Sequence, residues 1–113
     1  MMGIKVSNAL VVAGFALMPL LAHAQDTATF SIVARDGKLE PSELVVPAGK
    51  KIKIELSNEG KTPIEFESKA LKVETVLAPG ARSSVMVNAL KPGEYAFFDE
   101  FHPQTSKGKI IAK

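Results

Sequence analysis

Short apolar runs, each ended by turn-forming residues, are the feature of this chain that most restricts its fold. The segment 52–56, IKIEL, alternates apolar and charged side chains, which is the period of a strand with one buried face. Comparable apolar runs lie at 30–33, 44–46, 64–67, 73–77, 84–87, 95–98 and 109–112. Turn signals such as Asp36-Gly37 and Pro79-Gly80 separate them. About seven short strands at this spacing predict an all-β sandwich.

The amino-terminal segment has the pattern of a secretory signal peptide. Lys5 precedes the uncharged apolar run 9–21, and Ala22-His23-Ala24 is a small-x-small cleavage signature. The apolar run is shorter than the roughly 20 residues that a membrane-spanning helix needs, which favours cleavage over anchoring. We therefore expect a cleavable signal peptide at 1–24, cut after Ala24, and one folded domain at 25–113.

Composition excludes several classes of function. The formal net charge of +2 over 113 residues leaves no basic footprint for nucleic acid. The chain has no cysteine, so the domain must be stabilised by packing without disulfides. No Gly-x-Ser-x-Gly elbow or glycine-rich phosphate loop occurs, and beyond the signal peptide His102 is the only histidine, too few ligands for a zinc site of the usual Cys/His type.

Acidic residues around the end of the 95–98 run form the first candidate site. Tyr95, Phe97 and Asp99 share one strand parity, so Asp99 should point to the core end of the strand if the rings face the core. A buried carboxylate is costly unless it is paired, hydrogen-bonded or bound to a cation. Glu100 and His102 follow in an expected loop, and loops at the end of a rigid sandwich commonly carry function.

A second acidic group lies at Glu65, Glu67 and Glu74. Glu65 and Glu67 have the parity opposite to Ile64 and Phe66, so they should face outward or lie at the sandwich end. The residues alone leave two interpretations open. One is an ordinary protein surface without a site, because a Glu-x-Glu strand is typical of a solvated face and an Asp-Glu after aromatic residues is typical of a turn. A metal site is the alternative.

The carboxyl-terminal third resembles the signature of the cupredoxins. The matching residues are PGEY at 92–95, Asp99, His102-Pro103 and Gly108, and the segment 37–60 is similar to the family's opening strands. The resemblance implies a cupredoxin-like Greek-key β-sandwich. The sequence departs from the family pattern at the copper site. Asp99 stands where the family has cysteine, Thr105 or Ser106 lies near the methionine position, and 64–67 has no histidine. A blue-copper centre needs a thiolate with two imidazoles, so an ordinary blue-copper electron carrier is excluded.

A narrower resemblance is to the EfeO-type cupredoxin-like domain, through PIEFES at 63–68, LKPGEYAFFDEFHP at 90–103 and KGKIIAK at 107–113. It implies a periplasmic protein that assists ferrous iron uptake by binding iron, copper or both, with support of Fe(II) oxidation as an implied ferroxidase-type activity. The implied partners are the metal ion and an inner-membrane iron permease or another periplasmic component of iron uptake.

Carboxylates with one imidazole suit iron or Cu(II) and disfavour Cu(I). We predict a metal site formed by Asp99 and His102, with Glu65 or Glu67 from the neighbouring strand and Glu100 as the fourth ligand. Glu74 is a weaker candidate.

Two aromatic or sulfur-containing residues near these strands are expected in the core. Met86 lies between Val85 and Val87, and Tyr95 belongs to the strand that leads to Asp99. A metal chaperone without redox turnover and a metal-free docking module for a permease remain alternative functions. The sequence leaves open the physiological metal, the electron acceptor and the oligomeric state.

Overall fold

The computed structural model describes residues 27–113, which form nine strands and no helix. The predicted signal peptide, 1–24, lies outside the described residues. The strands are β1 (Ala28–Arg35), β2 (Lys38–Glu40), β3 (Glu43–Val46), β4 (Ile52–Asn58), β5 (Ile64–Ser68), β6 (Val73–Leu77), β7 (Arg82–Val87), β8 (Gly93–Asp99) and β9 (Gly108–Ala112). The predicted all-β sandwich is confirmed, with more strands than the about seven expected. Over residues 27–113, no helix has the length and apolar character needed to cross a bilayer.

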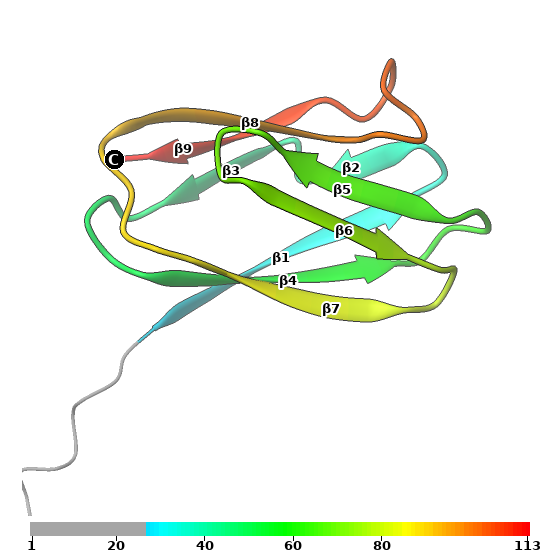
Figure 1. Cartoon of the computed structure of the whole chain (residues 1–113), viewed down its shortest axis with the longest axis horizontal. Helices are drawn as coiled ribbons and strands as arrows, with labels where there is room; N and C mark the ends of the chain where they lie inside the picture. The colour runs from blue at the N-terminus through cyan, green and yellow to red at the C-terminus, as the bar shows by residue number, and fades with distance from the viewer. Residues whose placement is uncertain (1–26) are drawn as a thin grey trace, which may run out of the picture.

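Two sheets pack face to face (Figure 1). One has the strand order β2-β1-β4-β7 and the other the order β3-β9-β8-β5-β6. β1 runs parallel to β4 and β3 parallel to β9, whereas the other neighbouring pairs are antiparallel. The chain crosses from one sheet to the other after β2, β3, β4, β6 and β7. The strands that carry the candidate residues, β5, β6 and β8, are therefore neighbours in one sheet.

The core lies between the sheets and follows the period-two pattern of the sequence. On β4, Ile52, Ile54 and Leu56 are buried while Glu55 is exposed, as the alternation predicts. The two core phenylalanines, Phe66 and Phe97, have ring centroids 5.4 Å apart. The buried apolar residues are Ile32, Ala34, Leu39, Leu44, Val46, Ile52, Ile54, Leu56, Ile64, Phe66, Leu77, Val87, Phe97, Ile110 and Ala112.

A two-residue turn joins β1 to β2. Arg35 pairs with Lys38, and the intervening Asp36 and Gly37 both have positive φ, 47° and 86°. Tight hairpins favour this left-handed pair of conformations, and Asp-Gly adopts it readily. The turn is confirmed, but β2 itself was missed, because a three-residue strand with one buried side chain, Leu39, is too short to show a period.

The turn after β1 and the connections that follow β4, β6 and β8 gather at one end of the sandwich (Figure 1). Asn58, which is 1% exposed, ties this end together. Its Nδ2 donates to the carbonyl oxygens of Thr62 (2.9 Å) and Leu77 (3.1 Å), and its backbone N–H donates to Ala81 (3.0 Å). The end of the sandwich at which β8 finishes is thus held by buried hydrogen bonds.

Candidate functional site

Asp99, the last residue of β8, is 1% exposed and points inward. Its Oδ1 accepts the backbone N–H groups of Glu65 and Phe101, both at 2.9 Å. Its Oδ2 lies 2.6 Å from Nδ1 of His102. The expectation that parity places Asp99 at the core end is confirmed. The buried carboxylate has the hydrogen bonds and the paired imidazole that make such burial tolerable.

The imidazole of His102 is held by residues from two distant segments. Gly37 lies next to the ring, since a Cβ added to it would be 3.4 Å from Cδ2 of His102, an ordinary van der Waals contact. Thr105 Oγ1 donates to the Gly37 carbonyl at 2.5 Å. Ser106, 1% exposed, accepts the Asp99 N–H at 2.7 Å, and its hydroxyl lies 2.7 Å from the His102 carbonyl. The loop after β8 is therefore fixed on both sides of His102.

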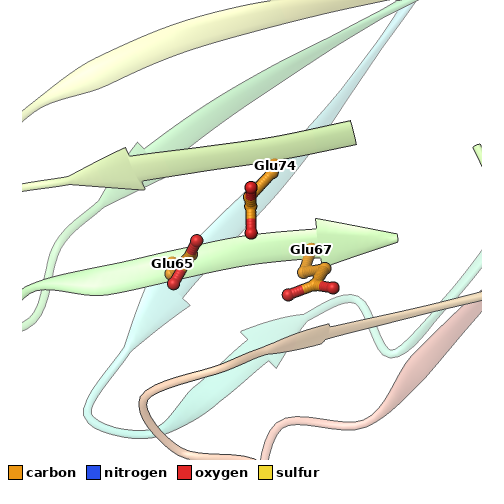
Figure 2. A group of neighbouring side chains, drawn as sticks. All are labelled: Glu65, Glu67 and Glu74. Atoms are coloured by element: carbon orange, nitrogen blue, oxygen red, sulfur yellow. The ribbon is translucent and has the colours of Figure 1, made fainter. Parts of the chain in front are cut away.

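Glu65, Glu67 and Glu74 form a separate group on the outer face of the five-stranded sheet (Figure 2). Glu67 and Glu74 are direct register partners on β5 and β6. One carboxylate oxygen from each of the three lies within 4.8 Å of the others. We call these three residues the glutamate cluster. The outward direction of Glu65 and Glu67 agrees with the parity argument, since Ile64 and Phe66, which alternate with them on β5, are buried.

Glu100 adds a fourth carboxylate next to the cluster. Its backbone N–H donates to the Glu65 carbonyl at 2.8 Å. Its carboxyl lies within hydrogen-bonding reach of Glu67 and, together with burial and the charge of Glu74, raises the pKa of Glu67 to about 6. Burial, followed by the neighbouring Glu74, raises the pKa of Glu65. Oε1 of Glu67 is buried with no hydrogen-bond donor within residues 27–113. Such an oxygen needs a shared proton or a cation.

The pH dependence of stability provides a first prediction. The folded-state pKa of Glu67 lies above its ordinary 4.5. Its contribution to stability is therefore fully present below about pH 4.5 and lost as pH rises through about 6. In metal-free buffer, Glu67→Gln should flatten the fall in the free energy of unfolding between about pH 4.5 and 6, as measured by urea titrations. The exposed control Glu55→Gln should keep the wild-type slope, and parallel curves for Glu67→Gln and wild type would contradict this reading.

The structure divides the predicted ligand set in two. Asp99 and His102 contact each other on the inner side, while Glu65 and Glu67 lie on the outer face with Glu74 and, beside them, Glu100. Glu74, the weaker candidate from sequence, is a full member of the cluster. Their assignment as metal ligands stays a prediction.

Four further residues near these strands either test a prediction from the sequence or were not predicted to contribute. The expectation that Met86 is a core residue is wrong: it is 50% exposed, because β7 is an edge strand and this side of it faces outward. Tyr95 packs against the core as expected, and its hydroxyl donates to the Lys91 carbonyl at 2.7 Å. Gly37 and the hydroxyl of Ser106 were missed as supports of His102. Their contacts join segments that no local pattern connects.

The residues at the end of β8 do not fit a blue-copper centre. Such a centre needs a thiolate and two imidazoles, whereas the chain has no cysteine and residues 27–113 contain one histidine. The carboxylate at position 99 is bound to that histidine and to two backbone N–H groups. These side chains therefore do not support electron transfer through a blue-copper ion.

Comparison with known proteins gives the same fold. A protein of Rickettsia prowazekii, "Uncharacterized protein RP394", is 36% identical over 80 residues, which cover 71% of this chain and 64% of that protein. The chain thus spans less than two thirds of this relative's length. Auracyanin A, a "blue" copper protein from Chloroflexus aurantiacus, aligns with a TM-score of 0.66 at 15% identity over 78% of this chain and 100% of its own. A purple cupredoxin from Nitrosopumilus maritimus aligns with a TM-score of 0.56 at 19% identity, with 78% of this chain and 100% of that one covered.

These structural likenesses are low in sequence identity and show the fold alone. The family profile described as "Cupredoxin-like domain" matches residues 8–112, nearly the whole sequence. That match agrees with the two packed sheets and their strand order. The chain belongs to the cupredoxin-like domain family.

Proposed function

We propose that this protein binds iron, copper or both in the periplasm and assists ferrous iron uptake, with the glutamate cluster as the binding site. The observation that carries the proposal is the arrangement of Glu65, Glu67 and Glu74, whose oxygens lie within 4.8 Å of one another and include the donor-free Oε1 of Glu67. Carboxylate oxygens are ligands that hard and borderline cations accept. The resemblance of 63–68 and 90–113 to the EfeO-type domain supports iron as the cargo and an inner-membrane iron permease as the partner.

The chemistry of the cluster bears on the oxidation state of iron. Oxygen ligands favour Fe(III) over Fe(II), so a cation held by three or four glutamates is easier to oxidise than the free ferrous ion. In the redox form of this function, the protein promotes the oxidation of Fe(II) to Fe(III). Dissolved dioxygen is the electron acceptor in the assay that tests it. A chaperone that binds and releases the metal without redox turnover is the non-redox form.

A metal titration is the direct test. Fe(II) under anaerobic conditions, Mn(II) and Cu(II) should each be added to the purified protein while thermal unfolding is followed. A ligand at about one hundred times its Kd stabilises the folded state by about 2.7 kcal/mol. The triple variant Glu65→Gln, Glu67→Gln, Glu74→Gln should lose this stabilisation.

The matched control removes the same number of charges from exposed positions elsewhere, with Glu43→Gln, Glu55→Gln and Glu94→Gln. It should respond to metal like the wild type. Equal metal responses in the two triple variants would show that the cluster is not the site. Binding with unchanged Fe(II) oxidation in air would favour the chaperone over the redox form.

A docking module that works without metal is the second candidate, and one observation favours it. A recess of about 330 Å³ along β8 and the loop that follows it is lined mainly by apolar groups. Phe98 lines this recess and is the register partner of Glu67. If no metal changes the unfolding temperature of the wild type, this recess becomes the leading candidate for function.

A further inference from the structure

The two oxygens of Asp99 have different partners, and this difference determines what the neighbouring histidine can do. Oδ1 accepts two backbone N–H groups, from Glu65 and Phe101. Oδ2 faces Nδ1 of His102 at 2.6 Å. A carboxylate can only accept hydrogen bonds, so Nδ1 must carry the proton that lies between the two groups.

The rest of the ring environment keeps the imidazole in this orientation. A Cβ added at Gly37 would be in van der Waals contact with Cγ and Cδ2 of the ring, so Gly37 lies next to it. Ser106 is hydrogen-bonded to both the backbone N–H of Asp99 and the carbonyl of His102. The His102 side chain is 30% exposed, whereas that of Asp99 is 1% exposed. The buried edge of the ring is therefore the one with Nδ1, and the nitrogen left for an external partner is Nε2.

We infer that Asp99 is a positioning residue, which holds His102 in the tautomer protonated on Nδ1 and leaves the lone pair of Nε2 free as an acceptor. The hydrogen bond between Asp99 and His102 fixes the ring at the end of β8. A carboxylate that accepts a hydrogen bond from one ring nitrogen of a histidine keeps the proton on that nitrogen and so sets the tautomer. This inference is independent of the proposed function, which rests on the glutamate cluster.

The isosteric variant Asp99→Asn gives an unusually sharp test, because the backbone fixes which way the amide must point. The atom next to the N–H groups of Glu65 and Phe101 has to be the amide oxygen. The amide NH₂ then faces Nδ1 of His102, and Nδ1 has to accept. The variant should therefore move the ring proton from Nδ1 to Nε2.

The measurement is the pair of ring ¹⁵N chemical shifts of His102 by NMR. It is made in alkaline buffer, at a pH above which the two shifts no longer change, so that the neutral ring is observed. We expect Nδ1–H in the wild type and Nε2–H in Asp99→Asn. Glu100→Gln, the same chemical change at the next residue, should leave the wild-type tautomer. If Asp99 only stabilised the fold, Asp99→Asn would change the free energy of unfolding but would not move the ring proton of His102 from Nδ1 to Nε2.

The wild-type spectrum tests the inference even if Asp99→Asn does not fold. An Nε2–H tautomer or an even mixture in the wild type would overturn it. A folded Asp99→Asn variant that keeps Nδ1–H would overturn it as well, because some acceptor other than Asp99 would then be setting the tautomer.

Discussion

Replacing Asp99 with alanine should lower the free energy of unfolding by about 3–5 kcal/mol, as expected when one partner of a buried pair is removed. The substitution leaves the N–H groups of Glu65 and Phe101 and Nδ1 of His102 without their acceptor. Each buried donor that loses its partner costs about 1–3 kcal/mol. Since a small domain has a total stability of about 5–15 kcal/mol, this change removes a large share of it.

Urea unfolding at neutral pH measures the loss. Glu43→Ala is the control, because Glu43 is acidic, exposed and lies on β3, three strands away from β5 in the same sheet. Its free energy of unfolding should stay within about 0.5 kcal/mol of the wild-type value. A loss below about 1 kcal/mol in Asp99→Ala would mean that water replaces the carboxylate at little cost, contrary to the buried geometry.

Replacing Phe97 with alanine should destabilise the domain by about 3–5 kcal/mol, the usual cost of deleting a buried phenylalanine side chain. Phe97 is 1% exposed and packs against Phe66 with ring centroids 5.4 Å apart. Its ring also occupies the space above Gly108, where an added Cβ would lie 2.4 Å from Cε1 of Phe97. Gly108 has no side chain that could move into the cavity left by the deleted ring.

Phe101→Ala is the matched control, since it makes the same chemical change four residues away on a ring that is 49% exposed. It should change the free energy of unfolding by about 0.5 kcal/mol or less. Similar losses in the two variants would show that the core does not depend on the contacts of Phe97. Chemical denaturation monitored by circular dichroism compares both variants with the wild type.

Local sequence patterns predicted much of the framework. The alternation at 52–56 predicted which side of β4 is buried, and Asp36-Gly37 predicted a tight turn. Strand parity alone placed Asp99 on the core side and Glu65 and Glu67 on the outer side, because successive side chains of a strand point to opposite faces. The predicted metal site nevertheless combined Asp99 and His102 with Glu65 or Glu67, which lie on opposite faces of the sheet in the structure.

Long-range strand pairing accounts for what the sequence left unresolved. β5 lies beside β8, so that Phe66 is the register partner of Asp99 and Glu67 that of Phe98. This pairing brings Glu100 to the glutamate cluster and the N–H of Glu65 to the Asp99 carboxylate. Turn signals and periodicity are local properties, whereas the choice of neighbouring strands depends on the burial of the whole chain.

The sequence by itself determined the all-β class, the buried face of clearly alternating strands such as β4 and the absence of a thiolate for copper. Only the tertiary structure decided that Asp99 bonds to His102 while three glutamates from β5 and β6 meet on the opposite face of the sheet. The physical reason is that hydrogen bonds and charge pairs act over a few ångströms. The folded sheets alone bring such distant residues within that range.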